Sequence, residues 1–513
     1  PELILLSHLS RTISRTCAFV VIALCFVFFL VTLHWPFLGD ATLIRYGLFL
    51  IQHGLTPYRD FVEINLPGAY FTDFLAEHLF GPSAVGWRFY DMCLLVLAGL
   101  SMQLFAHRGE RLAACIAAGL FALAHGGDGI AQAGQRDLAI AVLLCLGAGC
   151  LFQFLKTCHG AVWVAGFGIL HGWAATIKPT AVLITIPCLV VAVVHLRRAS
   201  KPAWMPAGVA ITSLLLPGCI AAVYLWRYKA ISSFWFVFHV LLPYHAQLSR
   251  RSISYLLLHS ISPFISLLAL WCLCLCIGRR ELSMNMRRTL LILCSLGGLA
   301  IYIAQGKGFP YHRYPLFVFL LPLIFFDTNT LLHSSRRAAV TAAIAAMVVG
   351  ACVLAPMRLA RILRYIPQDV FRNALVADLN QLGGGALNGR VQCLDTARGC
   401  IAALGSMKLE QSTSLFYDEF VFGPVPGSAV DVSRARFWRE IQARPPLVFI
   451  LEEDYFISDS NYAKLHSWPA FQDFLASHYV LYADRRSPGV DNWWGRAAPS
   501  PGYRLYVWNA GNR

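Results

Sequence analysis

The chain has 513 residues, of which 57% are hydrophobic and only 13% are charged, and its mean hydropathy is +0.59. Soluble domains average about 25% charged residues, so this composition excludes an ordinary soluble protein and indicates a polytopic membrane protein. The formal net charge of +15 lies mostly in short clusters beside apolar runs, which favours membrane lipids over nucleic acid as a partner.

Apolar runs of roughly 17–25 residues can cross a bilayer as helices. We expect about eleven spans, within a range of about ten to thirteen. They fall at residues 17–38, 86–106, 110–125, 136–155, 161–177, 180–196, 204–226, 253–277, 288–304, 314–334 and 338–356. The first run is long for the apolar core of a secretory signal and has no small-residue cleavage site, so we interpret it as a retained signal anchor.

Basic residues beside the spans predict the orientation, because Lys and Arg gather on the cytoplasmic side. A cytoplasmic N-terminus puts most clusters inside: Arg11 and Arg15, Arg108 and Arg111, Lys156, Arg197, Arg198 and Lys201, Arg279, Arg280, Arg287 and Arg288, and Arg336 and Arg337. An odd number of spans then leaves the C-terminus outside. Seven cations oppose the rule, so either the topology is wrong there or they bind an anion: Arg227, Lys229, Arg250, Arg251, Arg358, Arg361 and Arg364.

A transmembrane domain is predicted over residues 1–356, and a small extracytoplasmic α/β domain over 357–513. Strand-like runs lie at 445–451, 479–484 and 503–508. Between them, "SWPAFQDFLASHY" predicts a helix that Ser467 caps and in which Pro469 occupies the first turn. Cys393 and Cys400 lie in this domain, where an oxidising compartment would allow a disulfide; free thiols are the alternative.

Three polar loops are predicted on the outer side, at 39–85, 125–137 and 305–313. The first is long enough for interfacial helices of its own. After Asp40, polar and aromatic residues recur at helical spacing: Thr42, Arg45, Phe49 and Gln52. Gly54 and Pro57 end this pattern, which predicts an amphipathic helix at the outer membrane interface.

Two aspartates stand where apolar runs meet outer loops. Asp40 follows the first span in "GDATLIRYGLFLIQHGLTPYRDF", and Asp137 opens a later one in "GQRDLAI". Structural interpretations are available for both: Asp40 as a helix N-cap, and Asp137 as a cap or as a partner of Arg136. A capped carboxylate also stays ionised and oriented, as a general base must be, so the two roles of Asp40 are compatible.

Cations occupy similar positions. Lys178, in "AATIKPTAV", either reaches an outer cavity through the break at Pro179 or extends to the membrane interface. The short loop "QGKGFPYHRYP" concentrates cations, a histidine and hydroxyl groups at Lys307, Tyr311, His312, Arg313 and Tyr314. Such side chains can cradle a phosphate, and the alternative is a basic interfacial belt with tyrosine anchors. Predicted midplane positions carry almost no charge, which favours a reaction at the outer face over transport.

The features described above, taken in their order along roughly residues 16–356, resemble those of the GT-C superfamily of membrane glycosyltransferases. That superfamily includes protein O-mannosyltransferases, the aminoarabinose transferase acting on lipid A, and the bacterial RgtA/B/C/D-like enzymes. The matching segments are the stretch after Gly39, "INLPGAYFTDFLAEHLFGPSAVGWRFYD", "GQRDLAI", "IKPTAVL" and the late Lys/Tyr/His loop. Ala41 follows Asp40 where the protein mannosyltransferases typically have a second acid, which favours the branch that modifies lipid or polysaccharide.

The resemblance implies an inverting transfer of a sugar from a polyprenyl-phosphate donor to a lipid or polysaccharide acceptor. It places this reaction at the outer face of a bacterial inner membrane, with a cytoplasmic N-terminus and a periplasmic C-terminal domain. Asp40 would be the base that activates the acceptor, and Asp137 the second acidic position. The resemblance implies donor phosphate binding by Lys178, Lys307, Tyr311, His312 and Arg313. We expect further residues of the first loop on the acceptor side: Arg45, Arg59, Asp60 and Glu63.

One carboxylate and several cations suit such a donor, because its phosphate leaves readily, whereas glycosidases need a second carboxyl group to protonate a poor leaving group. A divalent metal can bridge a phosphate and an acid, but no local motif such as His-Glu-x-x-His is found, so none is assigned. Two alternatives remain. One is an O-antigen ligase or polymerase with a polyprenyl-pyrophosphate donor, for which residues 227–252 would be the arginine-bearing loop. The other is a flippase or transporter of lipid-linked sugars.

Overall fold

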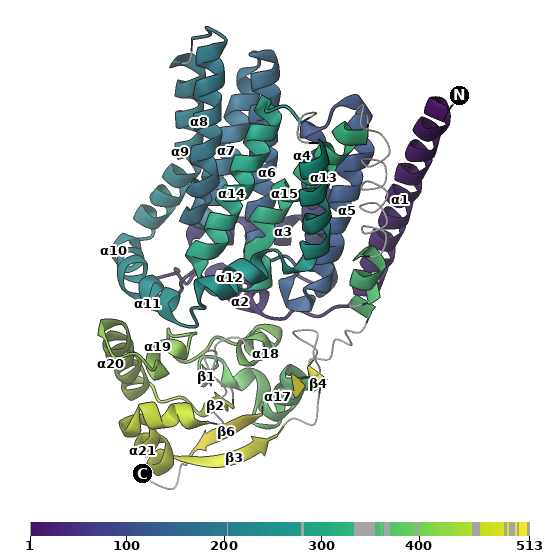
Figure 1. Ribbon diagram of the computed structural model, residues 1–513. Helices are drawn as coiled ribbons and strands as arrows, with labels where there is room; N and C mark the ends of the chain where they lie inside the picture. The colour runs from purple at the N-terminus through teal and green to yellow at the C-terminus, as the bar shows by residue number, and fades with distance from the viewer. Residues whose placement is uncertain are drawn as a thin grey trace.

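A computed structural model describes residues 2–202, 204–278, 282–332, 354–360, 362–363, 370–395, 399–453, 462–486, 490–491, 498–499 and 502–509. A bundle of long helices stands on a smaller α/β domain, and the N-terminus lies at the end of the bundle away from that domain (Figure 1). The predicted fold class, a polytopic helical membrane protein with a small C-terminal α/β region, is confirmed.

The bundle is built from helices that follow the apolar runs of the sequence. They are α1 (Glu2–Thr32), α4 (Ala84–Phe105), α5 (Arg111–Gly127), α6 (Arg136–Thr157), α7 (Ala161–Ile177), α8 (Val182–Arg198), α9 (Trp204–Arg227), α12 (Ile253–Ser260), α13 (Ile265–Gly278), α14 (Met286–Gln305) and α15 (Tyr314–Leu332). Most residues of α6 and α15 are buried at the centre. On α1 and α9, apolar side chains such as Phe19, Ile220 and Trp226 are exposed, as expected of surfaces that face lipid.

The described residues account for fewer spans than the predicted number of about eleven. In the described part of the chain, eight helical segments are long and apolar enough to cross a membrane, and Ala161–Ile177 is a shorter apolar helix. The expected span at 110–125 forms the 17-residue helix α5, most of which is buried against its neighbours. Hydropathy alone does not separate such a core helix from a span. The expected span at 338–356 lies almost entirely outside the described residues, as do Arg279, Arg280, Arg336, Arg337, Arg361 and Arg364.

The first loop contains α2 (Asp40–Gln52) and α3 (Pro67–Phe80), at the junction between the bundle and the α/β domain (Figure 1). We expected the first of these to lie at the lipid interface. Instead, α2 packs between α3 and α18 (Cys400–Met407) of the α/β domain, and most of its side chains are buried. The difference arises because its apolar residues pack against protein: Leu43 and Tyr46 share one cluster of buried side chains with Leu404 and Phe416.

A second connection at the same junction joins α9 to α12. It is helical over most of its length, as α10 (Ile231–Phe236), a π-helical turn η4 (Val237–Leu241) and α11 (Leu242–Gln247). Two shorter connections complete the junction, through the 3₁₀ turns η3 (Pro179–Ala181) and η6 (Pro310–Arg313). Loops that are far apart in the sequence therefore meet at one end of the bundle.

The α/β domain has a four-stranded sheet in the order β1-β2-β6-β3. β1 (Val391–Leu394) pairs parallel to β2 (Val448–Glu452), and β6 (Tyr503–Trp508) runs antiparallel to both β2 and β3 (Tyr479–Arg485). A two-stranded sheet joins β4 (Val490–Asp491) to β5 (Ala498–Pro499). The helices are α17 (Val370–Gln381), α18, α19 (Glu419–Phe422), α20 (Ser428–Ala443) and α21 (Pro469–His478).

The three strands predicted in this domain are confirmed, and β1 was not predicted. Pro469 is the first residue of α21, as expected, but Ser467 is not its cap. Trp468 holds the N-cap position, and the Ser467 hydroxyl donates hydrogen bonds to the carbonyl groups of Phe422 and Lys464 instead. Ser467 ends the preceding 3₁₀ turn, so its hydroxyl is committed before α21 begins.

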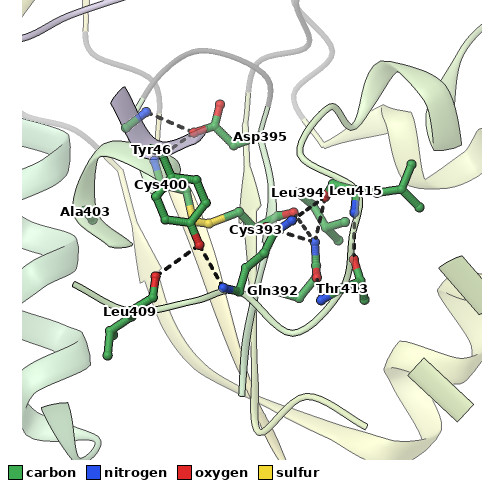
Figure 2. Close-up of a disulfide and its surroundings, with 12 residues drawn as sticks. Tyr46, Gln392, Cys393, Leu394, Asp395, Cys400, Ala403, Leu409, Thr413 and Leu415 are labelled. Carbon is green, nitrogen blue, oxygen red and sulfur yellow. Dashed lines mark hydrogen bonds between the residues drawn. A yellow bond between two sulfur atoms is a disulfide. The ribbon is translucent and has the colours of Figure 1, made fainter. Parts of the chain in front are cut away.

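Cys393 of β1 and Cys400 of α18 form a disulfide, one of the two outcomes left open by the sequence. The carboxylate of Asp395 accepts the backbone amides of Gly399 and Cys400 beside it, at 2.9 and 2.7 Å. Figure 2 shows Tyr46 of α2 next to this disulfide. Its hydroxyl donates to the carbonyl of Leu409 at 3.0 Å and accepts the amide of Gln411 at 2.8 Å. Helix α2 is thus hydrogen-bonded to the α/β domain.

Candidate active site

A cavity of about 280 Å³ lies where the first loop, the bundle and the α/β domain meet. Its wall contains apolar side chains such as Leu43, Ile64 and Phe309 together with a set of polar ones. The polar side chains are Asp40, Asn65, Arg136, Lys178, Thr180, His245, Gln305, Lys307, Tyr311, His312 and Tyr417. The cavity therefore combines one carboxylate with several cations, as a reaction on an anionic substrate requires.

Asp40 is the carboxylate on this wall, and its side chain is 29% exposed. Gly39, with φ 68°, turns the chain after α1, so that Gly39 is the N-cap and Asp40 is the first residue of α2. The N-cap interpretation of Asp40 is wrong, because no side-chain cap bond forms. Its Oδ2 accepts from Arg136 Nη2 at 2.9 Å and from the Tyr311 hydroxyl at 3.4 Å.

The charge of Asp40 is stabilised by these neighbours. Burial alone would raise the pKa of Asp40, but the Arg136 guanidinium and, more weakly, Lys178 outweigh it and hold this pKa below its ordinary value. The position at the start of α2 acts in the same direction, because a helix N-terminus favours negative charge. Asp40 is therefore an ionised carboxylate facing a cavity at neutral pH.

Asp137 and Lys178 form a second pair behind the first. Lys178 Nζ donates to Asp137 Oδ2 at 2.6 Å and to Gln305 Oε1 at 2.9 Å, and Gln305 Nε2 donates to Asp137 Oδ1 at 3.2 Å. Burial lowers the pKa of Lys178, and Asp137 counteracts part of that effect. Of the interpretations left open, snorkelling of Lys178 and pairing of Asp137 with Arg136 are wrong, since Lys178 faces the cavity and Arg136 binds Asp40.

The loop between α14 and α15 contributes Lys307, Tyr311 and His312 to the cavity wall. Lys307 Nζ donates to His245 Nε2 at 2.6 Å, and burial lowers the pKa of Lys307 to about 8. His312 is 4% exposed, and its Nδ1 has no hydrogen-bond partner among the described residues. Lys178 lies over the Tyr311 ring, with Nζ 5.8 Å from the ring centre. Lys307, His312 and Tyr311 therefore line the same cavity, and their binding of a donor phosphate stays a prediction.

Arg313 has a different environment. Its Nη2 donates to both oxygens of Asp128, at 3.1 and 3.2 Å, and its other nitrogens bond to Ser262 and to the carbonyls of His259 and Pro310. It does not line the cavity that holds Asp40. It lines a second cavity of about 590 Å³, whose other polar side chains are Asp128, Arg251, Tyr255, His259, Ser262, Lys307 and Arg358. Lys307 thus lines both cavities.

Glu63 lies behind the cavity wall, with no exposed surface. Its Oε1 accepts the backbone and side-chain amides of Asn65 at 2.7 and 2.6 Å and the Tyr417 hydroxyl at 2.9 Å, and its Oε2 accepts the Tyr70 hydroxyl. Burial raises the pKa of Glu63 above its ordinary value, against the effect of these donors. Because Tyr417 belongs to the α/β domain, Glu63 ties the first loop to that domain.

The other three residues predicted on the acceptor side line neither cavity. Arg45 donates to Glu77 at 2.6 Å and lies over the rings of Phe37 and Trp87. Arg59 and Asp60 form a surface pair at 2.8 Å. These contacts stabilise the fold of the first loop, and an acceptor role for them stays a prediction.

Seven residues at the site were not predicted from the sequence. Asn65, Arg136, Thr180, His245, Gln305 and Tyr417 line the cavity, and Glu419 of α19 contacts His245. Arg136 stands in "GQRDLAI". A charged side chain at the start of an apolar run is energetically costly, so its position could have marked it as a site residue. His245 lies in an ordinary interfacial segment, and Tyr417 and Glu419 lie in a domain where polar residues are common, so no local pattern marks them. Within the described residues, no group of three or more His, Cys, Asp or Glu side chains could hold a metal ion, and the neighbours of Asp40 are cations. This side-chain set does not fit a resident metal.

No protein-family model matches the sequence, and no curated protein matches it. Solved structures do resemble it. ArnT from Cupriavidus metallidurans in the apo state aligns with a TM-score of 0.60 and 11% identity, over 94% of this chain and 97% of that one. The same protein bound to undecaprenyl phosphate gives 0.58 and 12%, with the same coverage.

An Archaeoglobus fulgidus oligosaccharyltransferase tethered with an acceptor peptide gives a TM-score of 0.51 and 11% identity, over 91% of this chain and 73% of that one. At these identities the likeness is one of fold. ArnT and the oligosaccharyltransferase are both GT-C membrane glycosyltransferases, so the chain has the GT-C fold. The expected GT-C architecture is confirmed.

Proposed function

We propose that the protein is an inverting glycosyltransferase that moves a sugar from a polyprenyl-phosphate donor to a lipid or polysaccharide acceptor. The observation that carries this proposal is the pairing of one ionised carboxylate, Asp40, with Lys178, Lys307 and His312 around a single cavity in a GT-C fold. The positive-inside rule puts the N-terminus in the cytoplasm and supports an outer position for the α/β domain, at the other end of the bundle (Figure 1). The resemblance to bacterial enzymes supports a reaction at the outer face of a bacterial inner membrane, with the α/β domain in the periplasm.

Asp40 acts as the base in this reaction. It takes the proton of an acceptor hydroxyl as that oxygen attacks the anomeric carbon from the face opposite the phosphate. The new bond joins the acceptor oxygen to the sugar, and the bond between the sugar and the phosphate oxygen breaks with its electron pair on the phosphate. Inversion follows because a single displacement takes place.

Cations on the other wall stabilise the leaving phosphate. Lys307 is the main group, because it lines both cavities and its ammonium is hydrogen-bonded to His245. Lys178 and the Tyr311 hydroxyl lie nearer to Asp40, and His312 Nδ1 offers an unused polar atom to the ligand. Arg313 supports the loop from the second cavity through Asp128. Undecaprenyl phosphate bound to ArnT is consistent with a lipid phosphate as donor group.

The second cavity gives one specific reason to keep a runner-up function. Arg251 and Arg358 line it beyond Lys307, so a second phosphate group has cations within reach. That arrangement would suit a polyprenyl-pyrophosphate donor, as an O-antigen ligase or polymerase uses. The two functions differ in the lipid product that is released.

The test is a donor panel. Purified protein is reconstituted with polyprenyl-phosphate sugars, polyprenyl-pyrophosphate glycans and a crude extract of membrane glycolipids and polysaccharides, and the released lipid phosphate is identified. We expect polyprenyl phosphate from one sugar donor, and a loss of about 10³-fold in Asp40→Asn. Asp431→Asn, an exposed carboxylate on α20, controls for the change of residue type.

Two results would contradict the proposal. Asp40→Asn with an unchanged melting temperature and most of its transfer rate would remove Asp40 as the base. Release of polyprenyl pyrophosphate alone would favour the ligase or polymerase function.

A further inference from the structure

We propose that Glu419 and His245 are positioning residues for Lys307, so that the α/β domain sets the place and the charge of the cation that meets the donor phosphate. This inference rests on the proposed function, since it assigns positioning residues to the same site. It gives the C-terminal domain a part in the reaction that does not depend on recognising the acceptor.

Three side chains from three parts of the chain form one line of hydrogen bonds. Glu419 begins α19 of the α/β domain, and His245 lies on α11. Lys307 lies in the loop between α14 and α15. His245 Nδ1 contacts Glu419 Oε1 at 2.5 Å, and Lys307 Nζ contacts His245 Nε2 at 2.6 Å. Both His245 and Lys307 line the cavity that holds Asp40.

The chemistry of the three groups fixes the direction of each bond. An ionised carboxylate only accepts hydrogen bonds, so with Glu419 ionised the proton between the two groups lies on His245 Nδ1, which donates to Glu419. His245 Nε2 then presents a lone pair and accepts from the Lys307 ammonium. Glu419 is thus linked to Lys307 through the imidazole ring of His245. This is the way in which carboxylates orient imidazole ligands at other functional sites.

Burial makes this line more than a surface contact. Glu419 has no exposed surface, and its Oε2 has no hydrogen-bond partner among the described residues. A carboxylate in such a place is expensive unless a nearby positive charge compensates it. The Lys307 ammonium, which follows His245 in this line, supplies such a charge. The three residues therefore depend on one another.

The charges around Lys307 act in both directions. Burial lowers the pKa of Lys307 to about 8, and Glu419, followed by Asp40, raises it against that effect. Lys178 and Arg136 lower it further. The other titratable groups on the walls of the two cavities are Asp128, Arg251, Tyr255, His259, Tyr311, His312, Arg313, Arg358 and Tyr417. Among the groups that raise the pKa of Lys307, Glu419 has the largest effect. Without the charge of Glu419, Lys307 should therefore lose its proton at a lower pH.

The experiment compares pH profiles of kcat/KM for the donor. In the wild type this value should be level up to about pH 8 and fall about tenfold per pH unit at higher pH, as Lys307 loses its proton. Glu419→Gln keeps an acceptor for His245 Nδ1 and removes the charge, so the fall should begin about one pH unit lower. In Lys307→Arg the cation does not titrate, so the fall should disappear and Glu419→Gln should no longer move the profile.

A matched control separates this effect from a loss of stability. Glu440→Gln perturbs the same domain, because Glu440 binds the amide and hydroxyl of Ser414 and the guanidinium of Arg436, and neither of these partners lines the cavity. Its profile should coincide with that of the wild type. Equilibrium binding of a short polyprenyl phosphate, followed over the same pH range, reports the same shift without turnover.

The inference and the proposed function fail in different ways. No release of polyprenyl phosphate by the wild type from any donor would remove the proposed function. Release with a basic limb that Glu419→Gln leaves in place, or that Glu440→Gln moves equally, would overturn the role of Glu419 alone. A shift of the limb that persists in the Lys307→Arg background would show that Glu419 acts on another group.

Discussion

The helical bundle and the α/β domain supply the cavity in different ways. In the bundle and the first loop the charges form closed pairs, Asp40 with Arg136 and Asp137 with Lys178. The α/β domain contributes Tyr417 and Glu419, and both reach across the junction to partners outside their own domain. The bundle therefore holds its own charges in place, whereas Lys307 and Glu63 depend on the docked domain.

This difference follows from the cost of charge in the two environments. A charged side chain next to lipid must find a partner within the bundle, because the membrane offers none. A side chain of the α/β domain can be solvated, so a carboxylate there becomes costly only where the fold buries it, as it buries Glu419. Variants on either side of the junction should consequently differ in what they lose.

The largest effect on stability is expected inside the bundle. Lys178→Met leaves the carboxylate of Asp137, whose side chain is 1% exposed, without its cation. Breaking a buried pair in this way costs about 3–5 kcal/mol of unfolding free energy. Asp137→Asn should cost less, because Lys178 is 21% exposed and its ammonium can be hydrated in the cavity. Denaturant unfolding of both variants in detergent checks this order, and equal losses would contradict it.

The same contrast explains what the sequence could predict. Asp40, Asp137, Lys178 and the loop of Lys307 were found because each interrupts or borders an apolar run, where charge is rare enough to be a signal. The structure brings these residues together at one end of the bundle. Their chemical roles remain predictions. Glu419 and Tyr417 could not be found in this way, since nothing local distinguishes them from the other polar residues of the α/β domain.

The fold was predictable to a similar degree. Apolar runs predicted most of the long helices, and short strand-like runs predicted β2, β3 and β6, because burial acts on each of these patterns locally. Helix α5, expected as a span, is 17 residues long and mostly buried by protein, and hydropathy alone does not distinguish such a helix from one that faces lipid. The position of α2 was missed for a related reason. Its apolar face meets α18, and no local pattern shows which partner a face will have.

The next largest effect is expected at Lys307, which lies in a loop of the bundle and is linked through His245 to Glu419 of the α/β domain. Lys307→Met should lower kcat/KM for the donor by about 10²-fold, chiefly through a higher donor KM, because the cation proposed to bind the phosphate is lost. Lys156→Met is a suitable control, since Lys156 is exposed in the last turn of α6, at the opposite end of that helix from Asp137. Unchanged donor dependence in Lys307→Met would exclude this lysine from phosphate binding.

A smaller effect is expected within the α/β domain. The disulfide between Cys393 and Cys400 closes a short loop, with a sequence separation of 7. Its removal in Cys393→Ser should cost about 2 kcal/mol of stability. Reductant should lower the unfolding midpoint of the wild type and leave that of the variant unchanged. Cys219→Ser, at an exposed free cysteine of the bundle, should respond to reductant as the wild type does.

The smallest effect concerns the junction itself. Tyr417→Phe removes one donor to Glu63, which keeps the Tyr70 hydroxyl and both amides of Asn65, so the cost at neutral pH should be about 1 kcal/mol. Burial already raises the pKa of Glu63, so its folded state holds a proton more tightly than the unfolded chain. This residue therefore makes stability fall as the pH rises from the ordinary value of 4.5 through the raised one.

Loss of the Tyr417 hydroxyl should extend that fall to higher pH, because the donor favours the ionised form of Glu63. The variant and the wild type should then be almost equally stable at acidic pH, where Glu63 is protonated, and diverge towards neutral pH. Unfolding midpoints of the variant and the wild type, measured from acidic to neutral pH, test this expectation. A loss of stability independent of pH would mean that Tyr417 contributes through packing, and that the α/β domain is held to the first loop by apolar contacts such as those of Tyr46 and Phe416.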